Sequence, residues 1–158
     1  VGTCFEYDLT VTNPLDIHSP LNPQFLYSTA KAAVFLFLSK YFENESIDFL
    51  WTRIFYLYGE GEDERRLIAF LRKKLALGET VDLTSGNQIR DFMDVETAGS
   101  MIANASLGLN VGPFNVCSGK GQSIRELAEN IADEYGKRDL LNFGASQNDI
   151  SDAPFLCQ

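Results

Sequence analysis

Residues 47–55, Ile-Asp-Phe-Leu-Trp-Thr-Arg-Ile-Phe, form a short apolar run that is rich in β-branched and aromatic side chains. Such a run predicts a parallel strand that is buried on both faces. The preceding residues 25–42 contain neither glycine nor proline, and as a helix they would carry apolar side chains around most of the circumference. A stripe this wide predicts a helix packed against a sheet on one side and against another helix on the other.

Strands and helices alternate along the rest of the chain. The opening Val1-Gly2-Thr3 has the character of the end of a buried strand, and the proline-rich residues 7–24 form a predicted loop. Ser123 and Glu126 have the spacing of a capping box, which marks the start of a helix. The remaining elements that we expect are helices over 64–77, 97–107 and 123–135 and strands over 80–83, 88–95, 111–117 and 140–143. This alternation indicates a parallel α/β architecture.

Composition argues against several classes of function. The 158 residues carry a formal charge of -9, which disfavours nucleic acid as a partner because its phosphates would be repelled at long range. No apolar run approaches the ~20 residues of a membrane span, so we expect no membrane association. The three cysteines, Cys4, Cys117 and Cys157, form no CxxC pair. Their spacing predicts neither a disulfide framework nor a metal site and favours a reducing, cytoplasmic setting.

Tyr27 and Lys31 form the sharpest local pattern, Tyr-Ser-Thr-Ala-Lys. Residues four apart lie on the same face of a helix, so the phenol and the ammonium are neighbours. A nearby ammonium favours the phenolate and makes the phenol a usable proton donor or acceptor. The same spacing also occurs in helices where an aromatic residue merely neighbours a solvated lysine, so the pair needs support from its surroundings.

Further motifs surround this pair in a fixed order. They are GTCFEY at 2–7, YSTAK at 27–31, RIFYLYG at 53–59, QIRDF at 88–92 and FNVCSG at 114–119. Together they resemble the extended short-chain dehydrogenase/reductases, and more narrowly the NAD-dependent epimerase/dehydratase group of nucleotide-sugar enzymes. The resemblance covers residues 1 to about 135. It implies the C-terminal part of a Rossmann-type parallel sheet together with a small α/β substrate-binding lobe.

The resemblance also implies roles for individual residues. Thr3 matches the residue whose hydroxyl hydrogen-bonds the reacting sugar oxygen, and Tyr27 matches the acid/base. Lys31 matches the lysine that holds the nicotinamide ribose and favours ionisation of the tyrosine. The backbone of Phe55 would lie beside the nicotinamide. Arg90 would bind the substrate diphosphate, a role that suits a planar fork of donors.

Structural roles are the alternative for several charged residues. Arg53 lies within an apolar run and is predicted to be the partner in a structural ion pair rather than a ligand. Arg90 and the adjacent Asp91 could form a local salt bridge. Arg65 and Arg66 are expected on a solvated helix face, with reach toward a diphosphate as the alternative.

Departures from the family pattern narrow the expected reaction. The 4,6-dehydratases of this family place Asp-Glu after the catalytic threonine, where this chain has Cys4 and Phe5. A phenylalanine cannot abstract a proton, so dehydration is disfavoured, and 4-epimerisation or 4-keto reduction is favoured. Strand-like alternation would turn Glu6 the other way. Tyr56, near the sugar nucleotide, replaces an asparagine, and Thr97 replaces an aspartate.

The sequence has no Gly-x-x-Gly-x-x-Gly after an N-terminal strand to cradle a dinucleotide pyrophosphate. We therefore expect a fragment of an NAD- or NADP-dependent enzyme, inactive alone and binding the cofactor weakly or not at all. Residues 1–60 are predicted to be the remnant of the Rossmann domain. Residues 61–158 are predicted to be mainly the substrate-binding lobe, with some segments returning to the Rossmann sheet.

Two other functions stay open. The first is a degenerate, non-catalytic module that uses the apolar 25–42 helix for interaction, and the same helix is the expected contact of a homodimer. The second is a related reductase acting on small carbonyl compounds. Arg90 discriminates between this reductase and an enzyme whose substrate is a nucleotide-diphosphate sugar.

Overall fold

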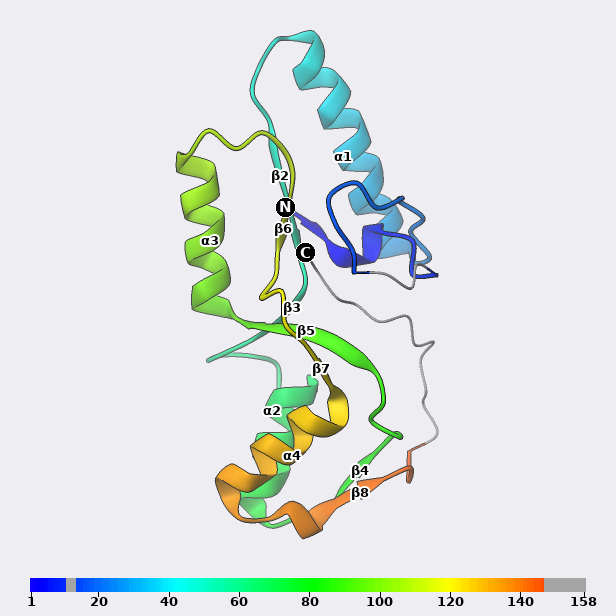
Figure 1. Ribbon diagram of the computed structural model, residues 1–158, viewed down its shortest axis with the longest axis vertical. Coiled ribbons are helices and arrows are strands. Elements are labelled where there is room, and N and C mark those ends of the chain that lie inside the picture. Colours follow the sequence, from blue (N-terminus) through cyan, green and yellow to red (C-terminus); the bar gives the residue numbers. More distant parts are fainter. Residues whose placement is uncertain (11–13, 147–158) are drawn as a thin grey trace.

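A parallel sheet with the order β1, β2, β6 forms the upper part of the molecule in Figure 1. The computed structural model describes residues 1–10 and 14–146. Its central strand β2 (Leu50–Ile54) pairs with β1 (Gly2–Thr3) on one side and with β6 (Gly112–Val116) on the other. Helix α1 (Leu26–Asn44) and helix α3 (Val95–Leu107) cover the opposite faces of this sheet (Figure 1). The buried parallel strand predicted at residues 47–55 is thus confirmed, and it is the centre of the sheet.

A second sheet continues from the first toward the lower part of the molecule. Strand β3 (Tyr56–Tyr58) follows β2 after Phe55 and pairs in parallel with β5 (Ile89–Asp94). The other edge of β5 pairs antiparallel with β7 (Gly121–Ser123). Strand β3 leads from β2 toward α2 of the lower part, and β5 leads from β4 back to α3, so residues of both parts meet at this crossing (Figure 1).

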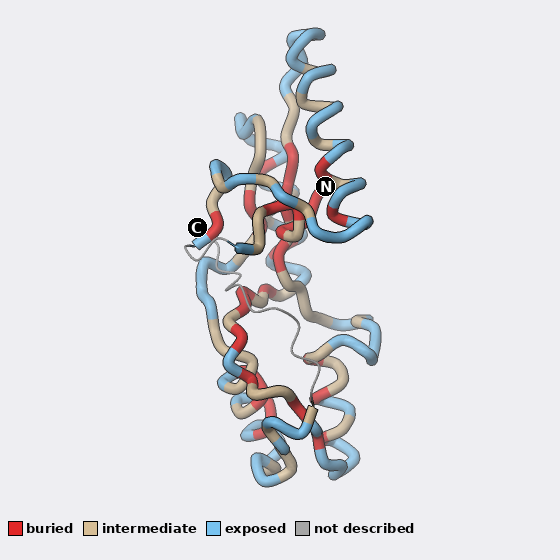
Figure 2. The backbone as a smooth tube through the Cα atoms, turned by 90° about the vertical axis from the view of Figure 1, so that its right-hand side faces the viewer, coloured by how far each residue is buried: buried red, intermediate tan, exposed pale blue. Residues whose placement is uncertain are grey.

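The lower lobe consists of two helices on a short pair of parallel strands. Helix α2 (Leu67–Leu77) packs against α4 (Ile124–Tyr135), and β4 (Val81–Leu83) pairs with β8 (Leu141–Phe143). Their aliphatic side chains form one buried core: Ile68, Leu71, Leu75, Val81, Leu83, Leu127, Ala128, Ile131 and Ala132. Figure 2 shows buried backbone both in this lobe and in the upper sheet.

The predicted helix signals are confirmed in this lobe. Ser123 and Glu126 form the capping box of α4. Gly78 and Gly136 end α2 and α4 with φ values of 73° and 63°, in the left-handed region where glycine has no Cβ penalty.

The prediction that α1 packs between a sheet and a second helix is wrong. Its buried residues are Ser28 and Ala32, whereas Phe37 on the opposite side is 68% exposed. Helix α3 covers the other face of the sheet and does not contact this side of α1 (Figure 1).

The cysteines depart in part from the expectation that their spacing supports no disulfide framework. Cys4 is free and buried, but Cys117 is disulfide-bonded. Cysteine spacing along the chain did not indicate this bond, because the fold and not the sequence separation brings thiols together. The expectation of a reducing setting therefore loses part of its support. Within the part of the chain that the structure describes, no helix has the length and apolar character needed to cross a membrane.

Candidate functional site

One cavity of about 960 Å³ lies where the two sheets meet. Its wall includes the end of β1, the first turns of α1, the passage from β2 to β3, the loop before α2 and part of β5. All of the site residues predicted from the sequence line it: Thr3, Tyr27, Lys31, Phe55, Tyr56 and Arg90. Segments that are distant in the chain thus supply one shared pocket, although the roles of these residues stay predictions.

Thr3 ends β1 and begins the short 3-10 helix η1 (Cys4–Glu6). Its side-chain oxygen accepts a hydrogen bond from the backbone N–H of Phe5 at 3.4 Å. Its own N–H donates to Oε1 of Glu6 at 2.8 Å. Both halves of a capping box are therefore present, and they fix the backbone that carries the Thr3 hydroxyl.

Tyr27 and Lys31 lie in the first turns of α1, as their spacing predicted. The Lys31 ammonium lies 5.9 Å from the centroid of the Tyr27 ring and donates to the carbonyl of Val1 at 3.1 Å. The Tyr27 side chain is 59% exposed, so its phenol is accessible from the cavity. The lysine therefore links the start of β1 to the helix that carries the phenol.

Arg90 and Tyr56 are neighbours in the wall of the same cavity. The Arg90 guanidinium lies 5.7 Å from the centroid of the Tyr56 ring, a cation–π distance, and its Nη1 donates to the carbonyl of Ile89 at 2.8 Å. Burial raises the pKa of Tyr56 to about 12. The Tyr56 phenol is thus protonated at neutral pH and suits hydrogen-bond donation rather than proton transfer.

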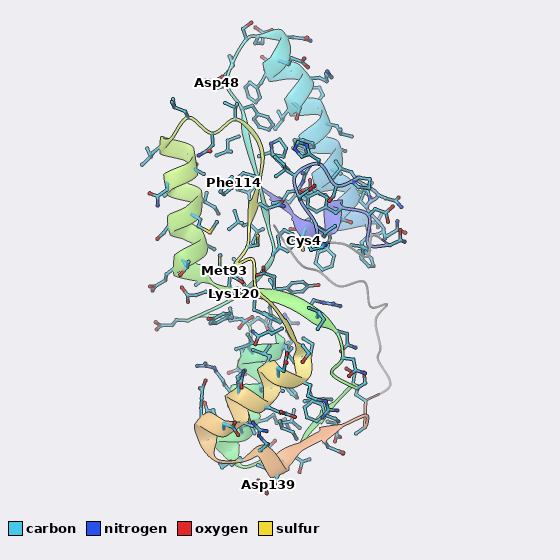
Figure 3. All side chains as sticks on the ribbon, in the orientation of Figure 1. Cys4, Asp48, Met93, Phe114, Lys120 and Asp139 are labelled. Carbon is cyan, nitrogen blue, oxygen red and sulfur yellow. The ribbon has the colours of Figure 1, made fainter. Side chains whose placement is uncertain are left out.

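Cys4 and Phe5 stand directly beside Thr3 in the wall of the cavity. Burial raises the pKa of the Cys4 thiol to about 12, so it is neutral at physiological pH. The Phe5 ring meets the rings of Phe25 and Tyr56 edge to face, with centroid distances of 6.1 and 5.9 Å. Figure 3 shows Cys4 at the turn after β1, next to the start of α1. This part of the wall therefore lacks a group that exchanges protons near neutral pH.

Glu6 and Arg53 form a fully buried ion pair with an Oε2 to Nε distance of 2.9 Å. The prediction of a structural ion-pair partner for Arg53 is confirmed. The strand-like alternation assumed for Glu6 is wrong, because η1 replaces the strand at this point. The carboxylate still turns away from the cavity, because the 3-10 turn directs it under Thr3.

Asp91 does not depend on its neighbour Arg90 for its hydrogen bonds. Its buried carboxylate accepts the backbone N–H groups of Ser118 and Gly119, each at 2.8 Å. Arg90 faces the cavity, whereas Asp91 holds the turn after β6. The two residues thus serve different parts of the fold.

Arg65 and Arg66 also line the cavity, from the loop before α2. Arg65 pairs with Asp63 at 2.5 Å, and Arg66 pairs with Glu62 at 3.2 Å. The sequence placed both arginines on a solvated helix face because the predicted helix began at residue 64. Helix α2 begins at residue 67, so they lie before it, at the rim of the pocket.

The arrangement combines a phenol, an ammonium and a hydroxyl near one another with arginines at the same cavity. Such a set can transfer a proton to or from a substrate oxygen and can bind an anionic group. In the described residues, no group of three or more His, Cys, Asp or Glu side chains could hold a metal ion.

Known proteins are similar to this chain in sequence. The chain is 30% identical over 139 residues to the dTDP-6-deoxy-L-talose 4-dehydrogenase (NAD(+)) of Aggregatibacter actinomycetemcomitans, covering 85% of this chain and 50% of that protein. It is 31% identical over 116 residues to the CDP-abequose synthase of Salmonella muenchen, covering 70% and 40%. The chain therefore spans about half the length, or less, of the curated relatives it matches.

A solved structure supports the fold. The UDP-N-acetylglucosamine 4-epimerase of Methanobrevibacter ruminantium M1, in complex with UDP-N-acetylmuramic acid, superposes with a TM-score of 0.90 at 23% identity over 99% of this chain and 52% of that one. The predicted fold class, part of a Rossmann-type α/β fold, is confirmed by this likeness. Residues 1–134 match the model of the NAD dependent epimerase/dehydratase family, and the chain belongs to that family.

Proposed function

We propose that this chain supplies the sugar-binding pocket and the proton-transferring residues of an NAD(P)-dependent enzyme that oxidises or reduces carbon 4 of a nucleotide-linked sugar. One observation carries the proposal: Thr3, Tyr27, Lys31 and Arg90 line a single cavity. The similarity to a protein named a 4-dehydrogenase favours oxidoreduction. Epimerisation at the same carbon is the second candidate and needs the same residues.

Proton transfer is assigned to Tyr27. A nicotinamide cofactor, when bound, accepts a hydride from the sugar carbon or supplies one to it. In the oxidising direction Tyr27 takes the proton of the sugar hydroxyl as the carbonyl forms, and in the reducing direction it returns that proton. Thr3 donates a hydrogen bond to the same oxygen. Lys31 stabilises the phenolate electrostatically, since its ammonium lies near the Tyr27 ring.

Arg90 is assigned to the substrate diphosphate, with Arg65 and Arg66 at the rim of the same cavity. A planar guanidinium matches two phosphate oxygens at once. The carboxylate partners Asp63 and Glu62 would have to release the rim arginines before these arginines contact a phosphate. Arg90 is therefore the primary anchor, and the rim pair adds to it.

The described residues fit the nicotinamide end of a dinucleotide. Tyr27, Lys31 and Phe55 line the cavity where the ribose and the ring would lie, whereas the sequence contains no glycine-rich pyrophosphate cradle. We propose that the chain alone binds NAD weakly. Titration calorimetry of the isolated chain tests this, and micromolar binding would contradict it.

The central experiment measures hydride transfer in the encoded protein in which this chain occurs. Formation of NADH is followed with NAD and either dTDP-6-deoxy-L-talose or CDP-abequose as probes. NADH production that depends on the nucleotide sugar supports the proposal. If neither probe yields NADH and neither binds to the protein, the proposed function is wrong.

The exposed face of α1 favours a second role, as the contact of a homodimer. Phe37 and Tyr41 are 68% and 49% exposed, and their stacked rings lie on the outer side of the helix. A charged residue there, Phe37→Glu, should convert a dimer into a monomer in sedimentation experiments. The matched change Leu109→Glu, at a fully exposed residue outside α1, should not. A wild-type chain that sediments as a monomer excludes this role.

A further inference from the structure

A buried polar network lies directly beneath Thr3, outside the cavity. Its centre is the ion pair between Glu6 and Arg53, whose side chains are 0% and 1% exposed. Neither residue is part of the cavity wall. Any effect of this pair on a bound sugar must therefore act through the residues that it contacts.

The Glu6 carboxylate holds the backbone of Thr3. Its Oε1 accepts the Thr3 N–H at 2.8 Å, and the indole N–H of Trp51 donates to its Oε2 at 3.1 Å. A Cβ atom on Gly2 would lie 2.1 Å from Oε1 of Glu6 and 2.4 Å from Nε1 of Trp51. Glycine at position 2 is therefore required by the carboxylate beneath the strand.

The Arg53 guanidinium extends the network to the neighbouring elements. It lies between two aromatic rings, with its Cζ 4.7 Å from the centroid of Tyr7 and 4.6 Å from that of Phe35. Its Nη1 donates to the hydroxyl of Tyr7 at 3.1 Å, and that hydroxyl donates to Oδ1 of Asn115 at 2.7 Å. Since Asn115 belongs to β6 and Phe35 to α1, the network connects the sheet to the helix that carries the proposed acid/base.

Buried ion pairs contribute little net stability, because the cost of removing both charges from water offsets their attraction. The hydrogen bonds of this pair reach several neighbouring elements, so its role is better explained by the geometry that it imposes on those neighbours than by a gain in stability. We propose that Glu6 is a positioning residue that holds Thr3 in register with Tyr27 and Lys31, and that Arg53 supplies the counter-charge that keeps its carboxylate buried. The proposal rests on the function proposed for Thr3, Tyr27 and Lys31.

Two double variants separate positioning from charge. Both carry Arg53→Met, which keeps much of the length of the side chain and removes the cation. One adds Glu6→Gln, which retains an oxygen that can accept the Thr3 N–H, and the other adds Glu6→Leu, which does not. Since neither leaves an unpaired buried charge, both are expected to fold. Ile131→Ala in the lower lobe is the control for lost stability alone.

Turnover of the two sugar probes by the encoded protein is the first measurement. The double variant with Glu6→Leu should lose kcat on the order of 10²-fold at unchanged KM, because a misplaced contact acts in the transition state. The double variant with Glu6→Gln should retain most of its kcat, and Ile131→Ala should retain both constants. Equal kcat in the two double variants, or a loss confined to KM, overturns the proposal.

Amide hydrogen exchange at Thr3, measured by NMR, is the second measurement and needs no turnover. If the wild-type protein does not react with or bind the probes, the proposed function fails, and exchange alone decides the positioning. The Thr3 N–H should stay protected from exchange in the variant with Glu6→Gln and should lose that protection in the variant with Glu6→Leu. This result supports positioning of the Thr3 backbone by the side chain at position 6. Equal protection in both variants overturns it.

Discussion

The lower lobe buries an aliphatic core between α2 and α4, whereas the upper sheet buries an ion pair, aromatic rings and an amide beside α1. The aliphatic core has no polar group to orient, so it contributes mainly stability through removal of apolar surface from water. The polar network beneath Thr3 depends on distance and angle at every contact. The comparison indicates that the lower lobe relies on apolar burial alone, whereas the upper region combines its own apolar clusters with a polar network of defined geometry. Variants in the two regions should therefore fail in different ways.

Tyr27→Phe should have the largest effect on activity. It removes the proposed acid/base and leaves the ring, so hydride transfer in the encoded protein should fall by about 10²–10⁴-fold. The melting temperature should hardly change, because Tyr27 is 59% exposed. Steady-state kinetics and thermal unfolding check the two halves of the prediction. A fall in activity of less than about threefold would remove Tyr27 from the mechanism.

Leu75→Ala should produce the reverse pattern. Leu75 is fully buried between the helices of the lower lobe, and truncation of a buried leucine costs about 2–5 kcal/mol of unfolding free energy. Chemical denaturation measures the loss. Affinity for the sugar probes, measured in the folded fraction, should stay at the wild-type value. A change in affinity would mean that the two regions are coupled.

Arg90→Ala tests the boundary between the two regions. Hydrogen bonds to charged groups contribute about 1.5–3 kcal/mol, so affinity for thymidine diphosphate in calorimetry should fall by roughly 10- to 100-fold. Arg138→Ala removes an arginine from exposed ion pairs of the lower lobe and should leave the affinity unchanged. Unchanged affinity in Arg90→Ala would favour a reductase of small carbonyl compounds over a nucleotide-sugar enzyme.

The smallest expected effect is the contribution of Glu126 to the pH dependence of stability. The backbone N–H and the hydroxyl of Ser123 hold the pKa of the Glu126 carboxyl below its ordinary value of 4.5. Because this pKa is lowered in the folded state, the ionised carboxylate stabilises the lobe above pH 4.5. That contribution is lost as the pH falls through the folded-state pKa. Urea unfolding of Glu126→Gln should show a weaker decline of stability in acid than wild type. Ser123→Ala should weaken the same pH dependence, and an unaltered acid profile in both variants would contradict the assignment.

Local signals predicted the lower lobe well. The Ser123 to Glu126 spacing and the glycines at 78 and 136 mark helix ends through backbone chemistry that depends on few neighbours. The same T-x-x-E spacing stands at Thr3 and Glu6, and it was the available signal for η1. Strand alternation concealed it, because β1 was assumed to continue.

Long-range features of the upper region were less predictable. Burial of Arg53 followed from its apolar neighbours, but its partner 47 positions away in the chain could be identified only once the sheet had formed. The exposed side of α1 has another cause. Apolar composition predicts that a helix is covered but does not identify what covers it, and α3 lies on the other face of the sheet.

Trp51 has a practical consequence, since it is the single tryptophan of the chain and its indole donates to the Glu6 carboxylate. Intrinsic fluorescence therefore reports on the upper region alone, without a label. Circular dichroism follows the helices of both regions. Superimposable melting curves from the two spectroscopies would describe a single cooperative unit, whereas an earlier fluorescence transition would reveal that the polar network melts before the aliphatic lobe.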